Sequence, residues 1–239
     1  RGFVAASVTY SVAFGAFFAT LVLLPLWLQQ NMGYTATWAG YATGIMGIFA
    51  VVCAPSVGKL TEKVDPRLIV SLGIIGLGAT VAWRMSFNSD VTFLQMAWPT
   101  LLMGPFMVMF FVPVTGLAMA SVDPDEQANA AGLSNFMRTL GGAFATSIVQ
   151  TGWANAAREN QTELAGAMYQ GQATLNGMMS DGMSHQSATA ALTGIVESQS
   201  VMLATLNMFA AITICFAVAA TLIWVAPKPK GPIDTSGAH

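Results

Sequence analysis

The stretch LSNFMRTLGGAFATS, residues 133–147, places polar side chains inside an otherwise apolar segment. Asn135, Arg138 and Thr139 lie about one helical turn apart, and Arg138 is the only charge near the middle of any apolar span. A helix that begins near Ala130 would carry Arg138 roughly 12 Å into a bilayer. Since an Arg at that depth costs at least about 2.5 kcal/mol in lipid, we expect it to face other helices or water.

Small residues accompany this segment and an earlier one. Helices pack closely in membranes where such residues let the backbones approach. The first set is Gly132, Gly141, Gly142 and Ala145, and the second is Gly40, Gly44 and Gly47. We therefore expect both segments to pack closely against neighbouring helices.

The composition predicts a polytopic helical membrane protein. Of the 239 residues 54% are hydrophobic and only 8% are charged, whereas a soluble domain has about 25% charged residues. A net charge of −2 argues against nucleic acid as a partner. Cys53 and Cys215 lie in apolar runs, which predicts packed thiols rather than a disulfide. The sequence contains no nucleotide loop, nucleophile triad or zinc signature, so it predicts neither an enzyme nor a bound cofactor.

The apolar runs predict an all-α protein with six transmembrane helices. The expected spans are residues 3–28, 38–57, 68–87, 93–119, 130–153 and 201–226. Residues 1–153 would hold the first five helices and residues 200–227 the last one. Between them, residues 154–199 are polar and predict a periplasmic loop with one or two short amphipathic helices, at 162–170 and 186–196. Residues 228–239 would form a cytoplasmic tail.

Basic residues set the expected orientation. Six spans place both ends of the chain on one side, which holds Arg1, Lys59, Lys63, Arg67, Lys228 and Lys230. The other side holds only Arg84, near enough to a span end to extend toward water, and Arg158. By the positive-inside rule both ends are cytoplasmic and residues 154–199 are external. Because Arg1 directly precedes an apolar run with no initiator Met, we also expect a fragment of a longer protein.

No Asp or Glu lies inside any predicted span. A proton-driven carrier generally needs a titratable group within the membrane, and Arg does not deprotonate in proteins. His185 and His239 fall in the external loop and the tail. Either a carrier is incomplete in this chain, or it is not coupled to protons.

Arg138 has two interpretations. It can be a packing residue that bonds to a neighbouring helix, or it can line a cavity and bind substrate. The fourth span adds Gln95 and contains Pro99, Pro105 and Pro113, which predict kinks. The cavity candidates are Gln95, Asn135, Arg138 and Thr139. Four tryptophans near span ends, Trp27, Trp98, Trp153 and Trp224, are expected to be interfacial anchors.

The loop GKLTEKVDPR, residues 58–67, resembles the repeated loop motif of major facilitator transporters. The matching residues are Gly58, Leu60, Glu62, Lys63 and Arg67, whereas Asp65 replaces a glycine of the motif. Gly58 would permit a tight helix exit, and the charges would form a cytoplasmic ion-pair latch between helices. A plain solvated turn is the alternative.

Three further stretches, GYTATWAG at 33–40, AWP at 97–99 and LSNFMRTLGGAFATSI at 133–148, resemble the EmrB-type multidrug efflux permeases. These are fourteen-span drug/proton antiporters of the major facilitator superfamily. The resemblance covers nearly the whole chain and matches the C-terminal six-helix bundle. The missing part would hold the carboxylates that couple protons.

The resemblance implies proton-driven export of hydrophobic drug-like compounds, often weak acids, across a bacterial inner membrane. It also implies a tripartite pump with a periplasmic adaptor of the EmrA type and an outer-membrane channel of the TolC type. Residues 154–199 are then a candidate adaptor contact. The alternatives are an exporter of siderophores or metabolites on the same scaffold, and a non-transporting membrane scaffold or sensor.

Overall fold

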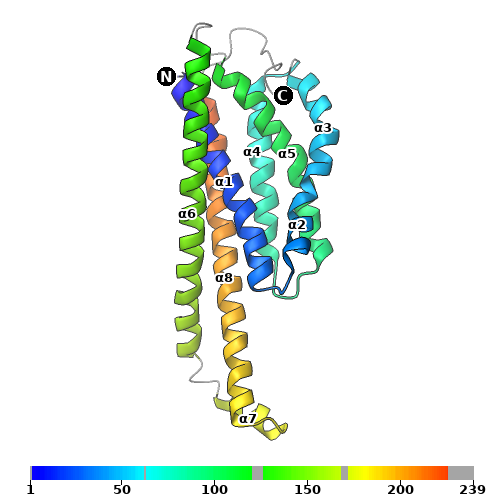
Figure 1. The fold of residues 1–239 in the computed structure, drawn as a ribbon, viewed down its shortest axis with the longest axis vertical. Coiled ribbons are helices and arrows are strands. Elements are labelled where there is room, and N and C mark those ends of the chain that lie inside the picture. Colours follow the sequence, from blue (N-terminus) through cyan, green and yellow to red (C-terminus); the bar gives the residue numbers. More distant parts are fainter. Residues whose placement is uncertain (1, 62, 120–125, 168–171, 226–239) are drawn as a thin grey trace.

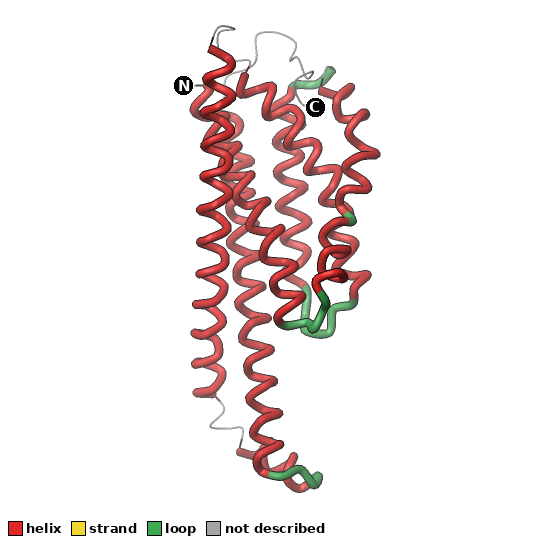
Figure 2. Tube along the Cα trace, viewed as in Figure 1, coloured by secondary structure: helices red, strands yellow, loops and turns green. Residues whose placement is uncertain are grey.

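The computed structural model describes the chain except residues 1, 62, 120–125, 168–171 and 226–239. The described residues form helices and short loops, with no strand among them (Figure 2). The elements are α1 (Gly2–Gln30), α2 (Ala36–Gly44), α3 (Met46–Thr61), α4 (Pro66–Trp83), the 3₁₀ turn η1 (Arg84–Ser86), α5 (Phe93–Met119), α6 (Gln127–Ala167), α7 (Gln172–Ser180), α8 (His185–Leu222) and the 3₁₀ turn η4 (Ile223–Val225). The all-α prediction is confirmed. Arg1, Glu62 and the predicted tail 228–239 lie outside the described residues.

The long helices stand side by side in an upright bundle (Figure 1). α6 packs along α1 and α8, α4 packs along α5 and α8, and α3 packs on α5. The beginning of α1 and the end of α8 lie at the same end of the bundle, and α1 contacts η4 there. The side of the membrane on which the two ends of the chain lie stays a prediction.

Five helical stretches are long and apolar enough to cross a membrane. They are Ser7–Gln30, Ala36–Thr61, Pro66–Ser86, Phe93–Gly116 and His185–Leu222. α6 contains the predicted fifth span but is not among them, and its polar residues and glycines, such as Asn135 and Arg138, are what make it less apolar than its neighbours. The structure thus confirms an all-α, multi-pass architecture, and the membrane position of α6 stays a prediction.

The polar segment between the last two predicted spans differs from expectation. In place of separate short helices at 162–170 and 186–196, α6 continues to Ala167 and α8 already begins at His185. No proline interrupts either helix, so helical hydrogen bonding continues after the apolar residues end. Residues 168–170 lie outside the described residues.

α6 and α8 extend beyond the rest of the bundle at the end opposite the start of α1, with α7 at the tip (Figure 1). Gln199 Nε2 donates a hydrogen bond of 3.1 Å to Ser89 Oγ in the loop before α5, which places Gln199 at the end of the bundle. We use the term arm for residues 161–167 and 172–198, which lie beyond that level. The stretch from His185 to Gln199 spans about 20 Å.

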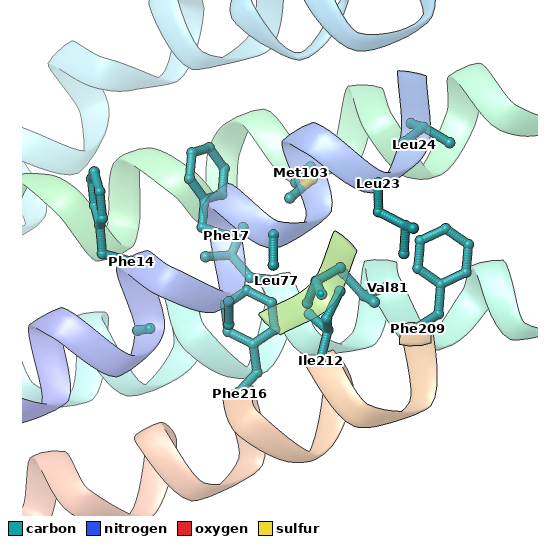
Figure 3. Packing of buried hydrophobic residues seen from close by; sticks show 14 of the residues in the cluster. Phe14, Phe17, Leu23, Leu24, Leu77, Val81, Met103, Phe209, Ile212 and Phe216 are labelled. Carbon is teal, nitrogen blue, oxygen red and sulfur yellow. The ribbon is translucent and has the colours of Figure 1, made fainter. Parts of the chain in front are cut away.

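The core lies between α1, α4, α5 and α8. Phe209, Ile212 and Phe216 of α8 point toward α4 and α1, and each is almost fully buried (Figure 3). Trp27 is 1% exposed and Trp153 is 7% exposed, so the prediction that they are interfacial anchors is wrong. Trp98 and Trp224 are about half exposed, which suits that role. Neither thiol is bonded, and Cys215 lies on an exposed face rather than packed.

Close packing occurs at only some of the expected glycines. A methyl group at Gly141 would lie 3.0 Å from the Ser11 carbonyl oxygen, and one at Gly15 would lie 2.9 Å from Ala145 Cβ. α1 and α6 therefore touch through small residues, as expected for Gly141, Gly142 and Ala145. The prediction was wrong for Gly132, Gly40, Gly44 and Gly47, which have no other atom within 4 Å of such a methyl group. These four face away from neighbouring helices, and spacing alone does not show which way a helix face points.

Two substitutions in α6 test this contact. Gly141→Leu should lower the free energy of unfolding by about 1–3 kcal/mol, because the new side chain meets the α1 backbone. The measurement is thermal unfolding of the purified protein in detergent.

Gly132→Leu is the matched control, since it places the same side chain on the same helix in open space. Equal destabilisation by both substitutions would contradict the α1–α6 packing.

Candidate functional site

Arg138 lies half-buried on the side of α6 that faces α1. Its Nη2 donates a 2.5 Å hydrogen bond to Asn135 Oδ1, one turn earlier on the same helix. Its Cζ lies 4.9 Å from the centroid of the Phe14 ring, which is a cation–π distance. The Tyr10 hydroxyl also interacts with the guanidinium. Arg138 is thus held by protein groups on two helices.

Thr139 belongs to the same group of residues. Its hydroxyl donates to the Asn135 carbonyl oxygen at 2.9 Å, and both side chains are exposed on α6. Three of the four predicted cavity residues, Asn135, Arg138 and Thr139, therefore lie together on one polar surface. Arg138 is only half-buried, so part of its guanidinium remains accessible after Nη2 has bonded to Asn135.

An aromatic cluster adjoins Arg138, and the sequence analysis missed it. The cluster consists of Tyr10, Phe14, Phe17 and Phe18 of α1 and Phe110 and Phe111 of α5. Phe14 stacks on Phe18 with 4.6 Å between centroids and meets Phe111 edge-on at 5.7 Å. The spacing of Tyr10, Phe14 and Phe18, four residues apart, was the available sequence signal, because such residues share a helix face.

The arrangement can bind an apolar molecule that carries a polar or anionic group. A guanidinium pairs with carboxylates and other oxygen acceptors, and ring faces bind apolar groups. Phe18 of α1 is the exposed ring next to this group, whereas Phe136, Leu140 and Phe144 are exposed on the side of α6 opposite Arg138. Asp and Glu are absent from the group of residues described here, so these residues cannot exchange a proton through a carboxylate.

Gln95 lies outside this group. Its Oε1 accepts from the Thr92 backbone N at 2.8 Å and from the Thr92 hydroxyl at 3.1 Å, which is a capping interaction at the start of α5. It lines a separate pocket of about 220 Å³ at the α4–α5 connection. The other lining residues are Trp83, Ser86, Phe87, Asn88, Val91 and Trp98.

Arg84 is the second arginine with an unexpected position. It was expected to extend toward water, but it is 0% exposed. Its Nη2 donates to Thr100 Oγ1 at 3.0 Å and lies 3.8 Å from Met103 Sδ, both on α5. Nε and Nη1 are buried without a hydrogen-bond partner in the described part of the chain. Because α4 ends against α5, the side chain points inward, and a position near a span end did not reveal this direction.

The loop motif is only partly described. Gly58 lies inside α3, which continues to Thr61, so the expected tight helix exit at Gly58 is wrong. Asp65 instead caps α4 by accepting from the Arg67 backbone N at 3.1 Å. Leu60 and Lys63 are exposed, whereas Arg67 is buried. Since Glu62 is outside the described residues, the ion-pair latch stays a prediction.

Among the described residues, no group of three His, Cys, Asp or Glu side chains is close enough to hold a metal ion.

The chain is similar to a family of membrane transporters and to several of its members. The family model of the Major Facilitator Superfamily matches residues 2–146. The Escherichia coli K12 "Multidrug export protein EmrB" is 32% identical over 97% of this chain, and the Neisseria gonorrhoeae "Fatty acid resistance protein FarB" is 31% identical over 96%. The Haemophilus influenzae protein of the name EmrB is 31% identical over 97%. The chain spans about half of each relative, since these matches cover 46% of their lengths.

A double-mutant cycle tests the Arg84–Thr100 contact. Thr100→Val should lower the free energy of unfolding by about 1.5–3 kcal/mol, because it leaves a buried charged donor without its acceptor. In an Arg84→Met background the same change should cost less than about 0.5 kcal/mol. Unfolding in detergent provides the measurement, and an equal cost in both backgrounds would show that the two side chains do not interact.

Proposed function

This chain belongs to the major facilitator superfamily of membrane transporters, and we propose that it is the C-terminal portion of a proton-coupled multidrug exporter. The observation that carries the proposal is similarity to a multidrug export protein and a fatty acid resistance protein over nearly the whole chain, from α1 through the arm to α8. A transporter family also argues against an enzymatic function.

The substrates that suit the site are hydrophobic drug-like molecules, often weak acids. The exposed ring of Phe18, which stacks on Phe14, would hold the apolar part, while Arg138 would pair with an anionic or polar group. Asn135 keeps the guanidinium in place. Gln95 remains a candidate only at a separate pocket.

The transport cycle proposed here is alternating access. This bundle would rock against a second bundle contributed by the rest of the longer protein, around a cavity near the middle of the membrane. α1 and α6 would line that cavity with Arg138. Prolines at positions 99, 105 and 113 of α5 are sites where a helix can bend during such a motion.

Proton coupling is proposed to use carboxylates in the part of the protein outside this chain. The predicted spans contain no Asp or Glu, and the relatives are about twice as long as the aligned segment. Exchange of a proton for the drug would then require both halves, with this half supplying part of the drug site.

The proposed location is the bacterial inner membrane, with both ends of this segment cytoplasmic and the arm in the periplasm. Lys59 and Lys63 near the end of α3 and Arg67 at the start of α4 support this orientation, because these helix ends lie opposite the arm (Figure 1). A periplasmic adaptor of the EmrA type and an outer-membrane channel of the TolC type would complete a tripartite pump. The arm is the proposed adaptor contact, because it is polar and lies beyond the bundle.

Substitution of Arg138 tests the drug site. In the longer protein, Arg138→Ala should reduce energised efflux of an anionic dye at least about tenfold, because the site loses its cation. Arg138→Lys should retain part of the activity, since it keeps the charge but not the planar donor geometry.

Arg158→Ala is the matched control, because it removes an exposed arginine from the same helix. Wild-type efflux by an Arg138→Ala protein that inserts normally would assign Arg138 to packing, and would favour a scaffold or a different substrate site.

Deletion of the arm tests the proposed partner. Replacement of residues 161–198 by a short Gly-Ser linker should abolish pull-down of an adaptor of the EmrA type while the bundle remains folded. Removal of α7 alone serves as a smaller deletion that maps the contact. Full retention of adaptor binding by the armless protein would contradict the assignment.

A further inference from the structure

α8 connects the arm directly to the centre of the bundle. The helix is continuous from His185 to Leu222, and it contains no glycine or proline after Gly194. Sharp bends in helices arise mainly at prolines, at Gly/Ser pairs or at inserted groups, and Gly194 is a lone glycine between Thr193 and Ile195 inside the continuous helix. The part of α8 between the arm and the core therefore has no built-in flexible joint.

Three polar contacts fix this helix where it leaves the bundle. The buried Trp153 Nε1 donates to Thr205 Oγ1 at 2.9 Å, which ties α6 to α8. Closer to the arm, Asn160 Nδ2 donates to the Ser200 carbonyl oxygen at 3.2 Å. The Gln199–Ser89 hydrogen bond described above adds the loop before α5. At the base of the arm, α8 is thus attached to two parts of the structure, α6 and the loop before α5.

Deeper in the bundle, the same helix packs tightly against α4 and α1. A methyl group at Gly78 of α4 would lie 3.1 Å from Phe216 Cβ, so there is little space between the two helices. Phe209 and Ile212 are also buried in this region, next to Leu23 and Val81 (Figure 3). A shift of α8 must therefore move residues of neighbouring helices, because packed interiors do not absorb displacements.

The dimensions allow such a shift to pass from arm to core. Gln199 lies about 20 Å from His185 and about 15 Å from Phe209 along the helix. If the helix tilts as a rod about its fixed base, a movement of about 3 Å at His185 produces about 2 Å at Phe209. Displacements of about 1–2 Å are sufficient to repack a helix interface.

We propose that α8 transmits the binding of a protein at the arm to the packing between α8, α4 and α1, so that occupancy of the arm changes the conformation of the bundle. The coupling itself follows from the helix and its contacts, and only its physiological partner rests on the proposed function. The protein that binds the arm should present a polar surface, since the exposed arm residues are mostly small or polar.

A Fab that recognises α7 and the turn at 181–184 serves as the probe, bound to the longer protein that contains this chain. Amide hydrogen exchange is measured in α4 and in residues 206–216 of α8. In the parent protein, Fab binding should change exchange in these core segments at least about threefold, because the arm and the core move together. An unchanged core in the Fab complex of the parent would overturn the proposal.

A variant with a flexible joint in α8 distinguishes loss of coupling from loss of Fab binding. Glu197→Gly combined with Ser198→Gly keeps the helix register and leaves the epitope intact, so the Fab should bind with the parent's affinity while the core response disappears. The control is Thr221→Gly combined with Leu222→Gly, which places two glycines at the other end of α8 and should retain the response. A full core response in the joint variant would also refute the proposal.

Thr205 provides a second test that does not depend on the joint variant. Thr205→Val leaves the buried Trp153 indole without its acceptor and should weaken the core response, whereas Thr205→Ser keeps the hydroxyl and should restore it. Equal responses in both variants would remove this hydrogen bond from the mechanism. The hydrogen-exchange experiment does not require transport. A separate efflux assay therefore shows whether the proposed export function fails while the coupling between arm and core holds.

Discussion

A half-buried guanidinium needs protein partners, and the arrangement of α1 and α6 supplies them for Arg138. Arg138 donates a hydrogen bond to Asn135 on its own helix, and its guanidinium lies over the ring of Phe14 on α1. The two helices can approach closely enough for the second contact because Gly141 lies against the α1 backbone. Small residues and the charged residue therefore act together, since the close approach brings the Phe14 ring to the cation.

α6 also extends outside the bundle, where it forms part of the arm. α6 is the least apolar of the long helices, and its polar part continues beside α8 into the arm. The contacts change along its length, from the apolar and aromatic surroundings of α1 to the Trp153–Thr205 and Asn160–Ser200 hydrogen bonds near the base of the arm. A single pair of helices thus joins the candidate drug site to the surface that would meet a partner.

Much of this architecture could be predicted from the sequence, because long apolar runs specify membrane helices and Arg138 stands out within them. The sequence did not reveal whether a given side chain points into the bundle or away from it. Trp27 and Arg84 both lie near span ends, where water or lipid headgroups are expected, yet both point into the core. Gly40 and Gly141 have similar sequence surroundings, but only Gly141 faces another helix. The arm was missed because its polar composition resembles a loop, although nothing in it breaks a helix.

Energised dye efflux from cells that lack their own pumps tests the division of roles between this chain and the rest of the longer protein. This chain alone is compared with this chain joined to its upstream coding sequence, with and without a protonophore. We expect that only the longer protein exports dye and that the protonophore stops it, because this half would supply a drug surface and its predicted spans contain no Asp or Glu. Protonophore-sensitive export by the short chain alone would contradict that division of roles.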